Sequence, residues 1–157
     1  MLGVALFFGG CGEKEVADEK PAKEQKSVKA PVREISFDEL ERRDEIQYVK
    51  GENKPFTGTA IRYYPDGWRT IIPYVNGIKH GTMIWYSRDG SKSFEMPYVD
   101  GKIHGTEFRY HKNGNKKEEK PFLEGIRHGT AIEYNEDGSK SAEYVFENGK
   151  EISREKF

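Results

Sequence analysis

The sequence lacks both a disulfide framework and an excess of one charge. Cys11 is the only cysteine in 157 residues, so no disulfide can form within the chain. The 26 basic and 27 acidic residues give a formal net charge of −1. Nucleic acids and anionic membranes favour strongly basic surfaces, so we expect no nucleic-acid partner. Charged and hydrophobic residues each make up 34% of the chain. This polar composition favours a sheet with one solvated face over a large two-layer core.

The sequence has no apolar run long enough to span a bilayer, which takes about 20 residues. The run from Met1 to Gly10 ends in Gly9-Gly10-Cys11 and resembles the lipobox of a bacterial lipoprotein signal. In that interpretation residues 1–11 form the signal, cleavage precedes Cys11, and the thiol carries the lipid. We then expect the mature chain in the bacterial cell envelope, anchored on the periplasmic or surface side. The alternative is a chance apolar terminus with a free thiol on a cytoplasmic protein.

The sequence also lacks any recognisable catalytic motif. No serine, cysteine or lysine has a companion base motif, and no glycine loop is spaced to hold phosphate. His80, His104 and His128 recur, but residues one repeat apart lie two strands apart, roughly 10 Å at about 4.8 Å per strand. Zinc binds imidazole at about 2.0–2.1 Å, so one ion cannot join them. We expect turn histidines bonded to local backbone, no metal, no cofactor and no enzyme activity.

What the sequence does contain is an internal repeat. Gly-Thr pairs begin at Gly58, Gly81, Gly105 and Gly129, with spacings of 23, 24 and 24 residues (81−58, 105−81, 129−105). A fixed period of this size is typical of repeat architectures. Within one repeat, Thr82, Ile84 and Tyr86 alternate with Met83 and Trp85, as along a β-strand. Each repeat is therefore predicted to form a β-hairpin, and successive hairpins to pair as a single-layer antiparallel meander.

Turn residues and prolines divide each repeat. Asp89-Gly90 and Asn113-Gly114 are typical of tight hairpin turns, which need residues with positive φ. Pro73, Pro97 and Pro121 recur at one position of the returning strand. Because proline cannot donate to the ladder, we predict a bulge or a strand end there.

The segment before the repeats has three predicted parts. Residues 12–34 are rich in Lys, Glu, Ala and Pro and are expected to form a disordered tether. In the lead-in, residues 35–55, Ser36 and Glu39 form a capping box that predicts a short helix from Ser36 to about Arg43. Ile46 to Lys50 is predicted to be the first strand. The hairpin repeats occupy residues 56–157, with Glu151 to Phe157 as a charged edge strand.

The repeat frame resembles a known family. The pattern His80-Gly81-Thr82-x-x-x-Tyr86, a glycine turn, a Lys/Glu-rich strand and a closing Tyr/Phe-x-x-Gly is similar to the MORN-repeat variant of many bacterial proteins. Some members carry the label YwqK-type antitoxin. The resemblance covers about Phe37 to Phe157. It implies an all-β repeat scaffold with no shared catalytic motif.

Aromatic residues recur in phase with the repeat. One set of tyrosines occurs at the same position of successive repeats, each with an apolar residue two positions earlier on the same side of the strand: Tyr63, Tyr86, Tyr110 and Tyr134. A second set of aromatic residues recurs on the returning strands: Tyr74, Tyr98, Phe122 and Phe146. These rings either hold the sheet together through cross-strand contacts or form a ligand-binding face. Three further aromatic residues do not recur from repeat to repeat and are therefore candidates for a specific contact: Tyr64, Trp68 and Trp85. The candidate binding face comprises Tyr63, Tyr64, Trp68, Trp85, Tyr86, Phe108, Tyr110 and Tyr134.

These features predict an exported, lipid-anchored, non-catalytic protein that binds a protein or peptide partner through its aromatic sheet face or an exposed edge. Two alternatives remain open. The family label suggests an antitoxin or immunity protein that neutralises a toxin, and the Trp85-Tyr86 pair faintly resembles repeats that bind cell-wall glycans.

Overall fold

The computed structural model describes residues 33–157. The predicted signal segment, Cys11 and nearly all of the predicted tether lie outside these residues. Strand β1 (Glu34–Ser36) begins at the last residue of the predicted tether. In the part of the chain that is described, no helix has the length and apolar character needed to cross a membrane.

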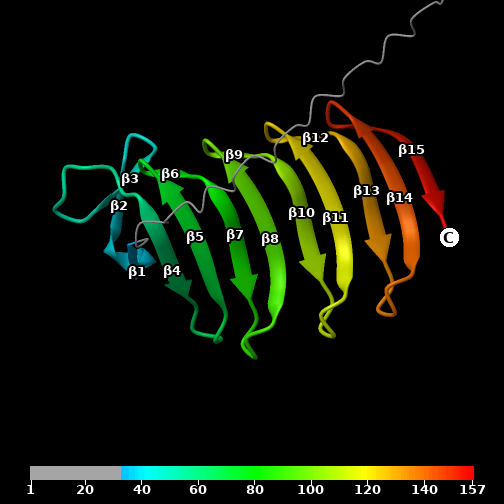
Figure 1. Cartoon of the computed structure of the whole chain (residues 1–157), viewed down its shortest axis with the longest axis horizontal. Helices are drawn as coiled ribbons and strands as arrows, with labels where there is room; N and C mark the ends of the chain where they lie inside the picture. The colour runs from blue at the N-terminus through cyan, green and yellow to red at the C-terminus, as the bar shows by residue number, and fades with distance from the viewer. Residues whose placement is uncertain (1–32) are drawn as a thin grey trace, which may run out of the picture.

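The repeats form hairpins laid side by side in one long, twisted sheet (Figure 1). The hairpins are β4 (Gly58–Tyr63) with β5 (Arg69–Val75), β7 (Gly81–Tyr86) with β8 (Lys92–Val99), β10 (Gly105–Tyr110) with β11 (Lys116–Leu123), and β13 (Gly129–Tyr134) with β14 (Lys140–Glu147), followed by β15 (Lys150–Lys156). The sheet follows chain order from β4 to β15, which confirms the all-β meander. The predicted edge strand is β15. One strand departs from the prediction, because β1 pairs with β4 in parallel and makes the sheet mixed.

The hairpins have two kinds of turn. At one end, Asp100 and Gly101 both have positive φ, +48° and +81°, as a two-residue type I′ turn requires. Short strands follow turns of this kind: β6 (Ile78–Lys79), β9 (Lys102–Ile103) and β12 (Ile126–Arg127). At the other end only Gly90 has positive φ, and the Asp89 carboxylate accepts the Ser91 N–H instead. The predicted positive φ is therefore wrong for Asp89, which acts through its side chain.

The unequal repeat spacing has a structural cause. In the later hairpins the register shifts by one residue near the turn, so that Tyr86 pairs with Lys92 while Trp85 pairs with Phe94. Ser93 is the extra residue of this bulge. The first hairpin pairs without a shift, which accounts for its 23-residue spacing in place of 24.

The prolines lie inside strands, contrary to the predicted bulge or strand end. Pro97 pairs with Thr82 within the β7–β8 ladder. On its other side the Pro97 carbonyl accepts the backbone N–H of His104, and the β8–β10 ladder resumes only at Glu95. The missing proline N–H therefore costs no ladder bond there. The irregular backbone lies instead in the facing chain, where Gly105 has a φ of +107°.

The lead-in forms a β-hairpin where a short helix was predicted. The capping box exists, with the Ser36 side chain and Glu39 in their expected roles, but it begins only a 3₁₀ turn, Phe37–Glu39. The chain then extends into β2 (Leu40–Arg43), which pairs with β3 (Ile46–Val49), close to the predicted first strand. Positive φ at Asp44 and Glu45 closes this hairpin with a two-residue turn. Strand pairing thus outweighed a local helix-start signal.

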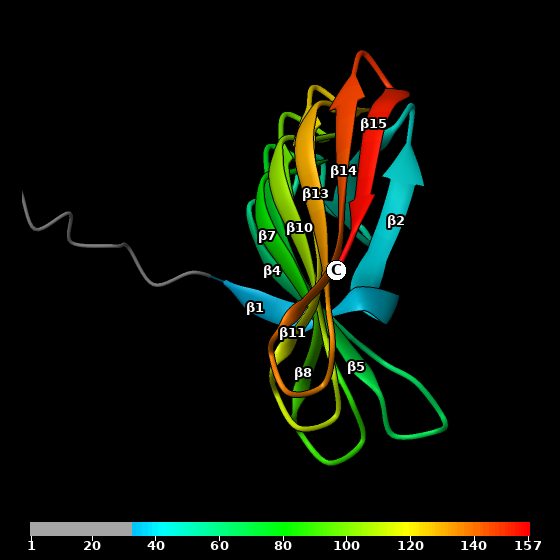
Figure 2. The ribbon, with the colours of Figure 1, turned by 90° about the vertical axis from the view of Figure 1, so that its right-hand side faces the viewer.

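The β2–β3 hairpin covers one face of the first repeats. Figure 2, an end-on view, shows β2 standing apart from the twisted sheet. Between them lies the buried core: Leu40, Val49, Phe56, Ala60, Ile72, Tyr74 and Met83. Gln47 of the hairpin donates its backbone N–H to the carbonyl of Gly77, in the turn between β5 and β6, and accepts the backbone N–H of Phe56, so the hairpin is tied to both segments. The protein therefore has two layers at its N-terminal end and a single layer beyond.

Candidate functional site

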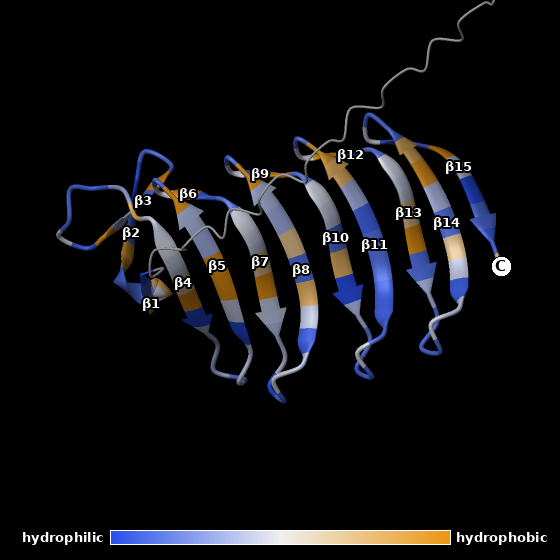
Figure 3. Cartoon of the chain, viewed as in Figure 1, coloured by the Kyte–Doolittle hydropathy of each residue, from blue (hydrophilic) through white to orange (hydrophobic). Residues whose placement is uncertain are grey.

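The sheet has two faces of different composition. We call the face that β2–β3 partly covers the inner face. Cross-strand pairing places one continuous row of residues along it: Arg62, Thr70, Trp85, Phe94, Arg109, Glu118 and Glu133. The row begins with a cation, becomes aromatic in β7 and β8, and turns charged from β10 onward. Figure 3, which colours the residues of both faces, shows hydrophobic bands in β4, β5 and β7, a largely hydrophilic β11, and hydrophobic bands again in β13 and β14.

An apolar groove occupies the aromatic part of the inner face. It has a volume of about 480 Å³ and is lined chiefly by Trp68, Met83, Trp85, Phe94, Met96 and Tyr98. Trp85 lies in its middle, with 36% of its surface exposed. The Trp85 ring centroid is 5.8 Å from that of Tyr64 and 6.3 Å from that of Phe94. These contacts fix the indole while leaving part of it open to a partner.

A charged network closes the groove on the C-terminal side. The Arg109 guanidinium lies 5.5 Å from the Phe94 ring and forms ion pairs with Glu107 at 3.2 Å and Glu118 at 3.4 Å. Glu107 is only 5% exposed, and Lys120 pairs with Glu118. Burial alone would raise the pKa of Glu118, but the Lys120 and Arg109 charges hold it below its usual value. The carboxylates and cations here neutralise one another, which suits a structural border.

The outer face carries one predicted row of tyrosines, which we call the tyrosine comb: Tyr63, Tyr86, Tyr110 and Tyr134. The hydroxyls of its last two members form hydrogen bonds to glutamates. Tyr110 donates to Glu95 at 2.8 Å and Tyr134 donates to Glu119 at 3.1 Å, while Lys116 pairs with Glu119 at 2.8 Å. Burial, reinforced by the bond to Glu95, raises the pKa of Tyr110 to about 12. These bonds link the second hairpin to the third and the third to the fourth, as expected for cross-strand contacts that hold a sheet together.

The predicted binding residues lie on two faces. Five belong to the outer face: Tyr63, Tyr86, Phe108, Tyr110 and Tyr134. Trp85 and Tyr64, whose rings are in contact, lie on the inner face. Trp68 lines the groove from the turn between β4 and β5. Tyr63 is 70% exposed. The structure thus separates the tryptophans from the comb.

The histidines act mainly through their backbone. His80, His104 and His128 each donate a main-chain N–H to the carbonyl of the repeated proline. The His80 ring lies 3.4 Å from an Asp100 oxygen, and His111 contacts the Tyr134 carbonyl at 2.9 Å. Within residues 33–157, no group of three His, Cys, Asp or Glu side chains is arranged to hold a metal ion.

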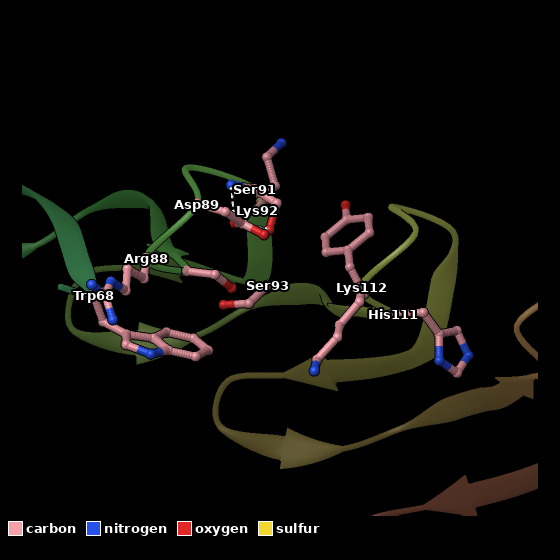
Figure 4. A pocket seen from close by; sticks show the side chains of 10 residues that line it. Trp68, Arg88, Asp89, Ser91, Lys92, Ser93, His111 and Lys112 are labelled. Carbon is pink, nitrogen blue, oxygen red and sulfur yellow. Dashed lines mark hydrogen bonds between the residues drawn. The ribbon is translucent and has the colours of Figure 1, made fainter. Parts of the chain in front are cut away.

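A second hollow, of about 560 Å³, lies along the turns that join β7 to β8 and β10 to β11. Figure 4 shows the Trp68 indole beside Arg88 and the Lys112 side chain reaching toward the same space. Ser91 and Asp89 bond to each other across the turn. The hollow is lined by long charged side chains such as Arg88 and Lys112 on exposed turns. Ordering such side chains around a ligand costs conformational entropy, so the hollow is a weaker candidate site than the groove.

Sequence reasoning missed Phe94 and Met96, the cross-strand partners of Trp85 and Met83 in the groove. A signal existed, because Met83 and Trp85 share a phase and their cross-strand partners, Met96 and Phe94, are also apolar. The equivalent pair two strands on is Glu107 and Arg109. A change from apolar to charged residues at one repeat position marks where the groove ends.

Comparison with known protein families agrees with the repeat frame. None of the curated proteins compared with the chain matches it. Residues 79–100 and 103–124 match the family described as MORN repeat variant. These segments run from β6 to the turn after β8 and from β9 to the turn after β11. The chain therefore contains two repeats of the MORN-repeat variant type, built as β-hairpins of one sheet.

Proposed function

We propose that this protein is a non-catalytic binding module that accepts a peptide segment of a protein partner in the inner-face groove. The observation that carries the proposal is the partly exposed Trp85, fixed between Tyr64 and Phe94 in an apolar groove. Large aromatic side chains held in this way supply contact area at low entropic cost and dominate many protein interfaces. The residues lining the groove are aromatic, thioether and hydroxyl side chains with one arginine, a composition suited to binding.

The proposal favours the inner face over the outer comb. The Tyr110 and Tyr134 hydroxyls already bond to glutamates of the preceding hairpin, so a ligand would have to compete with them. A ligand in the groove would not have to displace a tyrosine–glutamate hydrogen bond. Binding there would instead cover apolar surface that is now in water.

The test compares two adjacent residues on opposite faces. Full-length protein, Trp85→Ala and Tyr86→Ala would be used to capture partners from native host extracts, with proteins quantified by mass spectrometry. We expect Trp85→Ala to lose partners that Tyr86→Ala retains. Removing a central aromatic contact should weaken the binding free energy by about 2 kcal/mol, which is roughly a 30-fold loss of affinity. Circular dichroism would establish that both variants are folded. Equal retention by the two variants would refute the groove as the binding site.

We also propose that the module acts at the cell envelope, held by a lipid on Cys11. The support is the sequence alone: an apolar run, two glycines and a lone cysteine ahead of a charged segment. Mass spectrometry of the membrane fraction would find a diacylglyceryl-modified Cys11 at the mature terminus, and Cys11→Ser would release the protein from membranes. An unmodified, full-length chain in the cytoplasm would refute the anchor and favour the antitoxin alternative.

A further inference from the structure

A cavity lies between the β2–β3 hairpin and the inner face of the sheet. Its volume is about 940 Å³, and its walls come from the 3₁₀ turn, the hairpin, strands β4 to β9 with their turns, and Gly125. Of the cations in these walls, Arg42 pairs with Glu45 and Lys102 pairs with Glu124. It continues into the apolar groove, because Met83, Trp85 and Tyr98 line both. The covered end of the inner face and the open groove are thus one continuous surface.

Two cations line this cavity without an acidic partner among the described residues. The Arg62 guanidinium lies 3.5 Å from the Phe37 ring centroid, and the Lys79 ammonium lies 4.9 Å from that of Tyr98. The two carboxylates that also line the cavity have partners of their own. Glu45 pairs with Arg42, and Asp100 lies 3.4 Å from His80.

The two cations influence each other across the cavity. Burial, together with the nearby Arg62 charge, lowers the pKa of Lys79. Burial also raises the pKa of Tyr74, which lines the same cavity, to about 12. Two cations facing the same low-dielectric space repel each other, and an anion between them would relieve that repulsion.

A buried hydroxyl lies in the same place. Thr70 is 1% exposed, and its hydroxyl oxygen has no hydrogen-bond partner among the described residues. Thr70 pairs across the ladder with Arg62 on one side and Trp85 on the other, and it lines the cavity. Buried polar groups are nearly always satisfied, so a buried hydroxyl in the wall of a cavity that two cations also line can donate to an acceptor on a ligand bound there.

We propose that the cavity binds a carboxylate of the peptide partner, with the adjoining apolar side chains of that peptide in the groove. Arg62 supplies a planar pair of donors, Lys79 a second charge, and Thr70 a hydroxyl donor. Ser93 also lines the groove, and its hydroxyl, which donates to the Trp85 carbonyl at 3.2 Å, can still accept a hydrogen bond from a peptide N–H. This inference rests on the proposed function and adds the chemistry of the ligand.

The repeat supplies a matched control. Arg127 occupies the repeat position of Lys79 (79 + 48), and it lies 5.3 Å from the Phe146 ring centroid as Lys79 lies over Tyr98. The same two-repeat shift takes Arg62 to Arg109 (62 + 47, through the 23- and 24-residue steps), which, unlike Arg62, forms ion pairs with Glu107 and Glu118. Arg127 is thus a similar cation over a similar ring. It lies outside the cavity under the β2–β3 hairpin, and the neighbouring cations Arg109 and Lys120 are already paired with glutamates.

The test uses a small acid, 5-phenylvalerate, and its neutral amide as probes of the full-length protein. Binding would be followed by tryptophan fluorescence and by NMR shifts of residues near Trp85. We expect the acid to bind at least tenfold more tightly than the amide, and Arg62→Gln and Lys79→Gln each to weaken the acid roughly tenfold. Arg127→Gln should leave its affinity unchanged. Thermal melts would establish that all three variants are folded.

Several outcomes would overturn the inference. These are equal affinity for acid and amide, an equal loss in Arg127→Gln, or inorganic phosphate displacing the acid at lower concentration than acetate does. The result is separable from the proposed function. If Trp85→Ala loses its partners but acid and amide bind alike, the carboxylate site is refuted and the groove stands. If the acid binds as expected but Trp85→Ala keeps its partners, the groove is refuted as the partner site.

Discussion

Truncation of two neighbouring isoleucines provides a direct test of the two-layer core. Ile72 lies on the inner face, 5% exposed, in the cluster beneath the β2–β3 hairpin, whereas Ile71 lies half-buried on the outer face. Ile→Ala removes three carbons, about 2.4 kcal/mol at 0.8 kcal/mol per methylene. A residual cavity adds to this at a packed site. We therefore expect about 3–4 kcal/mol for Ile72→Ala and about 1 kcal/mol for Ile71→Ala.

Urea unfolding of both variants, followed by tryptophan fluorescence, would measure the difference. A double-mutant cycle with Val49→Ala adds a specific test of the hairpin, since Val49 and Ile72 belong to one buried cluster. We expect a coupling of at least about 0.5 kcal/mol with Ile72 and none with Ile71. Equal costs for the two isoleucines, or no coupling to Val49, would refute the hairpin as a cover for this face.

Three further predictions concern single side chains. Tyr110→Phe should remove one of the tyrosines that ionise near pH 12 in an ultraviolet titration. Burial and the bond to Glu95 raise the pKa of Tyr110 in the folded protein above its unfolded value. The stability that Tyr110 adds is therefore complete below about pH 10 and is lost as the pH rises toward 12. A titration unchanged by the substitution would contradict this. Thr70→Val should stabilise the ligand-free protein by up to about 1 kcal/mol in urea unfolding, because it replaces an unpaired buried hydroxyl with a methyl of the same shape; a clear loss would mean the hydroxyl is already satisfied. Gly105→Ala should cost about 1–2 kcal/mol, since φ is +107° and a Cβ would lie 3.3 Å from the Pro97 ring. Removing the ring as well, in Gly105→Ala with Pro97→Ala, should recover only the steric part, and full recovery would show that φ is not the cause.

Much of the hairpin array could be predicted from the sequence because its determinants are local. Strand alternation sets the face of each residue, so Ile84 and Tyr86 could be placed opposite Met83 and Trp85 without coordinates. The glycine turns set the hairpin ends. The choice of turn could not be read in the same way, because Asp89-Gly90 and Asp100-Gly101 have the same residues but different backbone conformations. The strand register on either side of each turn makes that choice.

The sequence by itself determined the period, the hairpins and the order of strands, since each depends on residues within about one repeat of each other. Only the tertiary structure decided what lies over the inner face. The capping box at Ser36 and Glu39 is a valid helix start, yet pairing with β3 and burial of Leu40 draw the next residues into a strand. The meeting of Arg62, Thr70 and Lys79 in one cavity likewise depends on strand pairing and on that hairpin. Such contacts join segments distant in sequence, and no local pattern encodes them.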